Sequence, residues 1–500
     1  MRVLSKSKIL AFRQCAKRLW LEIHHPELRE ESADTEARFE VGNQIGDIAR
    51  RLFDPAGKGV LIDLKRDGFE TAFARSAELL KSSQPIFEAG FSSDDALAFA
   101  DIMLPTKKVG QSGWRMIEVK SSTSVKDYHR DDIAIQSFIA KSAGVPLVSV
   151  ALAHIDNAWV YPGDEKYQGL LKENDVTDEA FGRSKEVKEW IADAQTTANK
   201  RSEPAIKTGR HCNAPYPCGF LNYCQQQEPQ AKYPVAWLPR IQTKALKALI
   251  DDKGVIDLRK VPDELLNERQ LRVKAHTLSG KPFFDANGAA SSLAGYKLPG
   301  YFMDFETIQF AIPIWKGTRP YQQIPFQFSM HRLAPAGKVD HLSFLDLSGN
   351  DPSSQFAEAL IGACGEKGPI FVYNAGFETA RLNELAERFP RLKNSLLAII
   401  ARVVDLLRVA EKNYYHPSQK GSWSLKKVLP PIAPDLNYDK LDGVQDGGMA
   451  MDAFLEAISP LTTEPRKKEI AVQLLAYCRL DTTALLRLWQ FFVGPQNSRP

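Results

Sequence analysis

The sequence predicts a mixed α/β protein of two or three domains, and three observations support this. Its 500 residues exceed what one hydrophobic core accommodates. Residues 1–228 alternate helical and strand-like patterns, and residues 299–500 begin with strands and continue as an α/β unit. Between them, residues 229–298 show short helical patterns separated by Gly and Pro. We therefore expect two α/β domains joined by a helical connector.

Composition places the chain among ordinary globular proteins. Hydrophobic residues make up 44% and charged residues 25%, which are typical of a protein with a packed core. No apolar run approaches the roughly 20 residues that cross a bilayer, and the N-terminus lacks the apolar stretch of a signal peptide. We expect a cytoplasmic protein without a membrane partner. A net charge of +4 neither requires nor excludes a nucleic-acid partner, because a local basic groove is sufficient for binding.

The C-terminal domain has the most regular pattern. Apolar runs and turn residues predict strands at 301–306, 326–331, 341–345 and 369–373. Helical periodicity predicts helices at 353–363, 376–388 and 466–491. We therefore expect strands first, with a long helix at the end of the chain.

Acidic residues recur at these elements with spacings that bring carboxylates together. Asp304 and Glu306 share one face of a strand because side chains alternate along it. Tyr477 and Asp481 share one face of a helix at i and i+4. Together with Glu378, these carboxylates suit two Mg²⁺ or Mn²⁺ ions, which prefer oxygen ligands. Such a pair of ions activates water for phosphodiester hydrolysis.

The order of these motifs resembles the DEDD (DnaQ-like) 3′–5′ exonucleases, which have a ribonuclease H-like fold. The resemblance implies that Asp304 and Glu306 form the first motif and that Tyr477 and Asp481 form the third. Asn374 matches the asparagine of the second motif, and Glu378 stands where the family usually has Asp. Tyr477 would orient the attacking water. Asp405 matches an aspartate that supports the site.

Two segments of this domain have the composition of substrate contacts. Arg319 follows the first motif in a Gly- and Pro-containing loop, and Trp423 stands close to Lys426 in the stretch 421–427. An aromatic ring beside cations suits base stacking and phosphate contact. Burial of Trp423 in the core is the alternative.

In the N-terminal domain, a strand at 99–104 carries Asp101, and its neighbour at 114–120 carries Glu118 and Lys120 on one face. A helix at 131–143 follows and carries Gln136. This arrangement resembles the PD-(D/E)XK nucleases, whose domain is restriction-endonuclease-like with α/β/α layers. The resemblance implies that Asp101 and Glu118 bind the metal ion and that Lys120 positions or activates water. Residues 41–47 lack the histidine found in many such enzymes, so Glu88 is a candidate replacement.

Cysteine placement extends this resemblance. Cys15 precedes the nuclease-like core, and Cys212, Cys218 and Cys224 follow it with five residues between successive members. One Cys before and three after resembles the iron–sulfur RecB-like nucleases, which implies that the four thiolates hold a [4Fe–4S] cluster. Zinc and buried free thiols are the alternatives. Cys364 and Cys478 are expected to be core residues.

Together, the two resemblances cover most of the chain. The whole chain is similar to an uncharacterised bacterial family in which a RecB-like domain is fused to a DEDD domain. These resemblances imply a metal-dependent nuclease with two sites, acting on DNA in repair or defence. An RNA-processing exonuclease is one alternative. A nucleic-acid-binding scaffold with an inactive nuclease site is another.

Overall fold

The computed structural model describes residues 2–30, 33–93, 95–108 and 111–494, and it divides the chain into two compact units. The first unit contains Met1–Pro229 together with Phe310–Gln322, and the second contains Gln230–Gln309 and Gln323–Pro500. The expected boundary at residue 228 therefore lies one residue from the observed one. The expected connector is not a body of its own, since it belongs to the second unit.

A seven-stranded mixed sheet forms the centre of the first unit, in the order β2-β3-β4-β5-β6-β7, with β1 paired to β4. The pairs β3–β4, β4–β5 and β6–β7 are antiparallel, and β1–β4, β2–β3 and β5–β6 are parallel. The strands are β1 (Leu4–Ser5), β2 (Val60–Leu61), β3 (Ile86–Ser92), β4 (Ala96–Lys108), β5 (Gln111–Lys120), β6 (Leu147–Ile155) and β7 (Leu171–Asp175).

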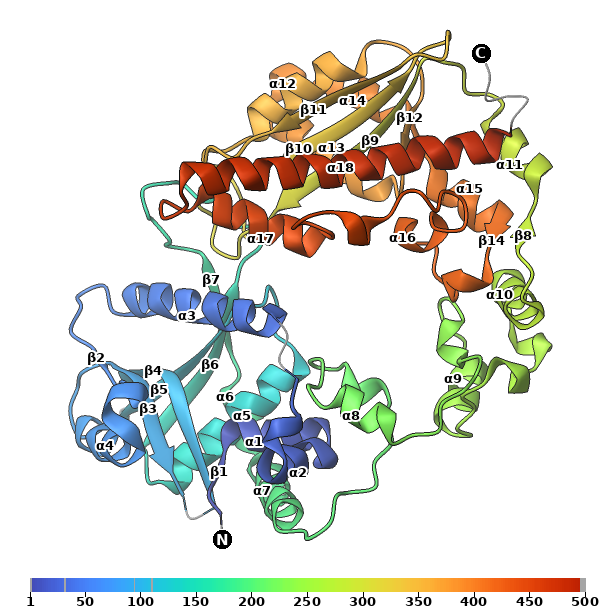
Figure 1. Ribbon diagram of the computed structural model, residues 1–500. Helices are drawn as coiled ribbons and strands as arrows, with labels where there is room; N and C mark the ends of the chain where they lie inside the picture. The colour runs from blue at the N-terminus through green and yellow to red at the C-terminus, as the bar shows by residue number, and fades with distance from the viewer. Residues whose placement is uncertain (1, 31–32, 94, 109–110, 495–500) are drawn as a thin grey trace. The chain divides into compact units, whose positions relative to one another are not determined.

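Helices cover both faces of this sheet because the strands alternate between two apolar faces. Met103 and Met116 pack with α1, α5 and α7, whereas Ile102 and Ile117 pack with Ala49 of α3. Figure 1 shows α3 on one side of the strands and α1 and α5 on the other. The helices are α1 (Lys6–Gln14), α2 (Ala16–His24), α3 (Ala33–Phe53), α4 (Leu64–Leu79), α5 (Asp127–Ser142), α6 (Thr177–Gly182), α7 (Ser184–Ala198) and α8 (Leu221–Gln226).

The segment Phe310–Gln322 leaves the second unit between two of its strands and packs within the first. Backbone hydrogen bonds join Tyr161 to it in both directions, 2.9 Å to the carbonyl of Thr318 and 2.8 Å from the N–H of Gly317. Ala311 packs in an apolar cluster with Ile45 and other residues of the first unit. The first unit is therefore completed by a piece of chain from beyond residue 300.

A five-stranded sheet in the order β11-β10-β9-β12-β13 organises the second unit. The strand β10 is antiparallel to both neighbours, whereas β9, β12 and β13 run parallel. The predicted strands and helices of this domain are confirmed. The strands are β9 (Gly300–Ile308), β10 (Ile324–Leu333), β11 (Val339–Leu345), β12 (Ile370–Val372) and β13 (Val403–Asp405), and a two-stranded ribbon pairs β8 (Phe283–Phe284) with β14 (Tyr414–Tyr415).

Alternation along β9 divides the cores of this unit. Met303 and Phe305 pack against α12 and α13, whereas Phe302 packs on the other face with Leu485 and Trp489 of the long helix α18. Figure 1 shows α18 running across the sheet. The helices are α12 (Ser353–Cys364), α13 (Gly376–Arg388), α14 (Lys393–Ile400), α15 (Leu406–Asn413), α16 (Leu425–Val428), α17 (Gly447–Ile458) and α18 (Glu464–Val493).

The segment expected to be a connector forms three helices that share the core of α18. Leu246, Val273 and Leu293, one from each helix, are all buried in that core. Their burial explains why the segment belongs to the second unit. These helices are α9 (Lys244–Asp251), α10 (Glu268–Ser279) and α11 (Ala286–Leu293).

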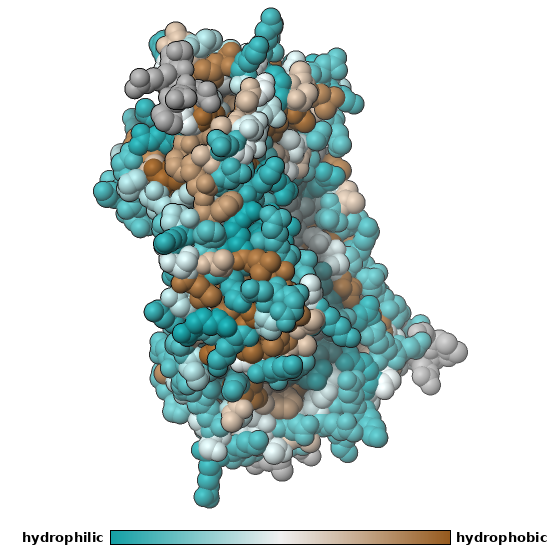
Figure 2. All heavy atoms as spheres, turned by 90° about the vertical axis from the view of Figure 1, so that its right-hand side faces the viewer, coloured by the Kyte–Doolittle hydropathy of each residue, from teal (hydrophilic) through white to brown (hydrophobic). Residues whose placement is uncertain are grey.

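The surface mixes polar and apolar residues. Figure 2 shows one face, on which hydrophobic residues lie among hydrophilic ones, the ordinary state of a globular surface. Among the described helices, none has the length and apolar character that crossing a membrane requires.

Candidate functional site

The first two carboxylates of the C-terminal motifs lie together as the strand pattern predicts. Asp304 and Glu306 project from the same face of β9, toward α18, and their oxygens and the Sγ of Cys478 all lie within 4.8 Å of one another. Cys478 is fully buried, as expected of a core residue. Its position beside two carboxylates was not foreseen, although it directly follows Tyr477 of the third motif.

The third motif brings α18 to the same place. Asp481 is buried, and it accepts hydrogen bonds from two tyrosines, Tyr477 of its own helix and Tyr438. The hydroxyl of Tyr438 lies 2.6 Å from Oδ1 of Asp481. Tyr438 was missed because it stands in the short 3-10 turn Tyr438–Lys440, distant from every motif. In the sequence, the only available signal for Tyr438 was a tyrosine in an otherwise polar turn.

Glu378 reaches the site from the first turn of α13. It is 2% exposed, and its Oε2 has no hydrogen-bond partner among the described residues. The turn before α13 is set by Asn374, which has a left-handed φ of 77°. Asp405 accepts a 3.0 Å hydrogen bond from the backbone N–H of Asn374 and caps α15 through the N–H of Leu407. Asp405 thus supports the turn that leads to Glu378.

Burial makes ionisation of these carboxylates costly. Burial, followed by the charges of Asp481, Glu306 and Glu378, raises the pKa of Asp304 well above its usual value. Burial is also the main cause that raises the pKa of Glu306 to about 8 and that of Glu378 to about 8. The pKa of Asp481 rises to about 6, again mainly through burial, and its tyrosine partners oppose the rise. Three buried acids and the half-buried Asp304 could therefore hold a cation here.

Lys426 is close to this cluster. Its ammonium lies 5.0 Å and 5.5 Å from the ring centres of Tyr438 and Tyr477 and donates a 2.7 Å hydrogen bond to the carbonyl of Gln445. It lowers the pKa values of Glu306 and Asp481 against the larger effect of burial. Lys426 thus remains a candidate contact for a phosphate at this site.

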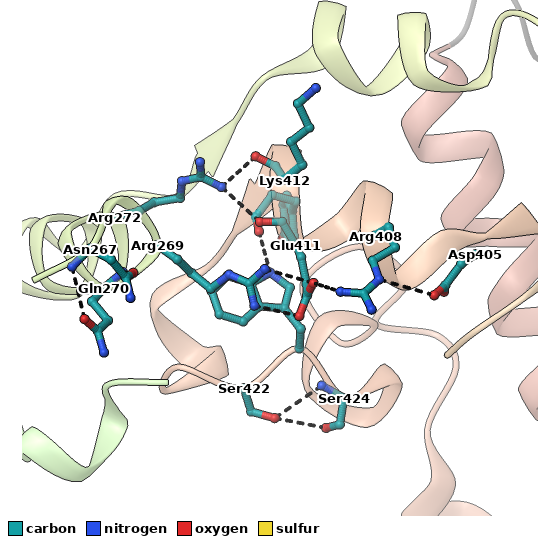
Figure 3. Close-up of polar contacts among 12 residues, drawn as sticks. Asn267, Arg269, Gln270, Arg272, Asp405, Arg408, Glu411, Lys412, Ser422 and Ser424 are labelled. Atoms are coloured by element: carbon teal, nitrogen blue, oxygen red, sulfur yellow. Dashed lines mark hydrogen bonds and ion pairs between the residues drawn. The ribbon is translucent and has the colours of Figure 1, made fainter. Parts of the chain in front are cut away.

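Trp423 is a core residue, and base stacking on it is ruled out by its burial. It is 6% exposed, its indole N–H donates to the carbonyl of Tyr414 at 2.8 Å, and the guanidinium of Arg269 covers its ring at 5.5 Å. Figure 3 shows Arg269 and Arg272 of α10 reaching Glu411 and Lys412 of α15. Arg269, which covers Trp423, and Arg272 therefore fasten α10 to α15.

Arg319 lies in the segment Phe310–Gln322, which packs within the first unit. It is half-buried, and its backbone N–H donates to the side chain of Gln322 at 3.0 Å. The expectation that this loop lines the scissile strand came from its position after the first motif in the sequence. The contacts assign it instead to the first unit.

In the first unit, three neighbouring strands carry the predicted carboxylates. Ile102 pairs with Ile117 and with Phe87, so Asp101 stands opposite Glu118 on one side and Glu88 on the other. Glu88 has a left-handed φ of 56° inside β3, a strained conformation that recurs at functional sites. Oε2 of Glu118 is buried without a hydrogen-bond partner among the described residues. Carboxylate oxygens are ligands that a hard divalent cation prefers, but within the described chain the oxygens of these three residues do not all lie within 4.8 Å of one another.

Two lysines and a fourth carboxylate surround Glu118. Oε1 of Glu118 accepts from Lys120 at 2.8 Å, as the strand pattern predicts, and from Lys6 at 3.0 Å. Both lysines also pair with Asp132 of α5, which accepts from Gln136 at 3.2 Å. Lys6 and Asp132 were missed. The i, i+4 spacing of Asp132 and Gln136 on one helix was the available signal for Asp132. No sequence motif indicated Lys6.

The four predicted cysteines lie together. Cys15 separates α1 from α2, Cys212 and Cys218 stand in the loop before α8, and Cys224 stands within α8. All four line one small cavity of about 10 Å³. Burial is the main cause that raises the pKa values of Cys212, Cys218 and Cys224. Within the described chain, no three of these sulfur atoms lie within 4.8 Å of one another.

Comparison with other proteins reveals relatives but no activity. Residues 301–424 match a family described as a domain of unknown function, DUF2779. The chain is similar to "Uncharacterized protein MG366" of Mycoplasma genitalium, at 26% identity over 43% of this chain and 35% of that protein. It is also similar to "Uncharacterized protein MG366 homolog" of Mycoplasma pneumoniae, at 27% identity over 38% of this chain and 31% of that protein. The chain thus spans about a third of the length of these curated relatives.

Proposed function

We propose that this protein is a metal-dependent nuclease whose second unit removes nucleotides from 3′ ends. The observation that carries the proposal is the close group of Asp304 and Glu306 of β9 with Cys478 of α18, whose oxygens and sulfur all lie within 4.8 Å of one another. The charges of Asp481 and Glu378 also raise the pKa of Asp304, after the larger effect of burial, which supports their place around the same site. Buried carboxylates that repel one another are stabilised by divalent cations, and two such ions activate water and stabilise the leaving oxygen.

The residues present fit Mg²⁺ or Mn²⁺. The donors are carboxylate oxygens, and Oε2 of Glu378 has no partner among the described residues that would compete with an ion. Tyr477 would orient the attacking water, and Tyr438 holds Asp481. Antiparallel strands β9–β11 followed by parallel β12 and β13, with the first carboxylate pair on the central strand, support a ribonuclease H-like arrangement. The proposed location of the protein is the cytoplasm. Its proposed substrate is a nucleic acid, with DNA favoured over RNA.

A second nuclease site is proposed in the first unit. Asp101 and Glu118 would bind the metal ion, with Glu88 beside them, and Lys120 would act on the water and the developing charge. The mixed sheet with helices packed on both of its faces supports a restriction-endonuclease-like domain with α/β/α layers. Glu88, opposite Asp101 on the neighbouring strand β3, is proposed to serve in place of the absent histidine.

The four cysteines are proposed to hold a [4Fe–4S] cluster. Tetrahedral zinc with Zn–S distances of about 2.3 Å needs sulfur atoms about 3.8 Å apart. No three of these sulfur atoms lie within 4.8 Å of one another in the described chain, which supports a multi-iron cluster, whose ligands bind different iron atoms. The cluster would join Cys15, near the N-terminus, to the segment 212–224, which lies shortly before Pro229.

The test is digestion of DNA and RNA oligonucleotides labelled at the 5′ end, with Mn²⁺ or with EDTA. We expect stepwise shortening from the 3′ end that requires Mn²⁺, and loss of this shortening in Asp304→Ala. The matched control is Asp340→Ala, which changes an acidic residue of β11 outside the carboxylate cluster. Undiminished 3′ trimming by a protein carrying both Asp304→Ala and Lys120→Ala would refute the C-terminal assignment. Binding without cleavage would favour the scaffold alternative.

A further inference from the structure

Lys6 has no place in any motif, yet the fold holds it firmly in the N-terminal carboxylate cluster. Leu4 and Ser5 form β1 and pair with Ala96 and Leu97 of β4, the strand that carries Asp101. Ser5 then caps α1 by accepting from the backbone N–H of Lys8. Lys6 is the first residue of that helix. Its position is therefore fixed by a strand pairing on one side and a helix cap on the other.

Lys6, Glu118, Lys120 and Asp132 form a closed ring of alternating charge. Lys6 lies 3.0 Å from Oε1 of Glu118 and 3.1 Å from Oδ1 of Asp132. Lys120 lies 2.8 Å from the same Oε1 and also pairs with Oδ2 of Asp132. Each lysine thus contacts both carboxylates, and each carboxylate contacts both lysines.

The two lysines form the open side of this ring. The side chains of Lys6 and Lys120 are 21% and 19% exposed, whereas those of Glu118 and Asp132 are 3% and 7% exposed. An ammonium group has three N–H donors, and two carboxylate contacts leave one donor for another acceptor. The other oxygen of Glu118, Oε2, is buried without a hydrogen-bond partner among the described residues.

We propose that Lys6 is a second phosphate-binding lysine of the N-terminal site, and that Asp132 is a positioning residue that holds Lys6 and Lys120 side by side. The proposal rests on the proposed nuclease function, since it names a group that contacts the substrate at that site. Two ammonium groups at one carboxylate oxygen suit the non-bridging oxygens of one phosphate, which carry the negative charge of the polynucleotide backbone. A purely structural ion pair is the competing explanation.

Salt dependence separates these explanations, because removing one phosphate-binding cation lowers the slope of log K against log salt by about 0.7 for a single strand. Binding of a fluorescein-labelled single-stranded oligonucleotide would be measured on the full chain carrying Asp304→Ala, with Ca²⁺ in place of Mn²⁺, at salt concentrations from about 50 to about 200 mM. Lys6→Met should weaken binding about fivefold at about 0.1 M salt and lower the slope by about 0.7. Lys6→Arg should retain the slope.

The matched control is Lys8→Met. Lys8 lies on the same helix and pairs with Glu22 at 3.0 Å, so its loss removes an equal charge and an ion pair outside the ring. It should leave both affinity and slope unchanged. Should Lys6→Met fail to fold, Lys6→Gln removes the same charge with a polar side chain, and the same lowered slope is expected.

An unchanged slope in Lys6→Met, or an equal change in Lys8→Met, would overturn the assignment of Lys6. Failure of the proposed function looks different. In that case the unmodified protein binds the oligonucleotide with the predicted dependence on Lys6 but cleaves neither DNA nor RNA with Mn²⁺.

Discussion

The hydroxyl of Tyr438 donates a 2.6 Å hydrogen bond to Oδ1 of Asp481, although 43 residues separate them. Tyr477, one helical turn before Asp481, donates to the same carboxylate. Asp481 is therefore oriented from two directions, by its own helix and by the turn that precedes α17. In its proposed role as a metal ligand, Asp481 would lose little rotational freedom when an ion binds.

Removing the hydroxyl of Tyr438 should impair the C-terminal site without dismantling it. A hydrogen bond to a charged group contributes about 1.5–3 kcal/mol, so Tyr438→Phe should lower Mn²⁺-dependent 3′ trimming about tenfold. Tyr415→Phe is the matched control, since it removes a buried hydroxyl that bonds Thr277 at 2.7 Å, away from the carboxylates. Equal activity losses in the two variants would mean that only general destabilisation was measured.

Divalent ions should stabilise the folded protein. An ion that binds only the native state, at a concentration about 100 times its dissociation constant, adds about 2.7 kcal/mol of stability. We expect Mn²⁺ to raise the urea midpoint of the protein and Glu306→Gln to reduce that gain. A Glu306→Gln protein that gains as much stability as the unmodified protein from Mn²⁺ would contradict Glu306 as a ligand.

In the presence of EDTA, stability should fall as the pH rises from about 4.5 to about 8. The pKa values of Glu306 and Glu378 are raised from 4.5 to about 8, mainly by burial. Between these values the folded state holds protons that the unfolded state has released, so increasing pH disfavours the folded state. Urea unfolding at the two ends of this pH range measures the slope.

Glu378→Gln should flatten this dependence, because the variant has no proton to lose at that position. Glu387→Gln, on the exposed side of the same helix, is its control. An unchanged pH dependence in Glu378→Gln, or stability that rises with pH in EDTA, would show that Glu378 does not carry the effect.

Protein purified without oxygen should contain roughly four iron atoms per chain and absorb in the visible range, as expected for a [4Fe–4S] cluster. Replacing Cys212 by Ser should remove both the iron and the colour, whereas Cys364→Ser should retain them because Cys364 is buried in the second unit. One zinc per chain without iron would correct the metal. Four freely titratable thiols without either metal would remove the site.

Periodicity was sufficient to predict the residues that share an element. Asp304 and Glu306 on β9, and Glu118 and Lys120 on β5, lie together because side chains two apart face the same way. The helix and strand positions of the C-terminal domain followed from the same patterns. These relationships are local, and local geometry can be read along the chain.

Residues that enter a site from distant elements could not be predicted in this way. Lys6 and Tyr438 bond carboxylates that are 112 and 43 positions away, and Asp132 bonds an ammonium 12 positions away. Which of many lysines or tyrosines does so depends on tertiary packing. The same limit applies to Trp423. In the sequence, a tryptophan near basic residues looks the same whether its ring is open for base stacking or covered, as here, by Arg269.

The excursion of Phe310–Gln322 into the first unit makes the usual dissection of this chain unsuitable. A fragment ending at Pro229 would lack Ala311 and the backbone partners of Tyr161, and would leave Ile45, Ile48 and Leu170 without part of their cover. A fragment beginning at Gln230 would carry the same stretch as an unsupported loop between β9 and β10. We therefore expect neither fragment to fold as well alone as in the full chain. Exchange of either half for a related module would also have to preserve the thirteen residues Phe310–Gln322.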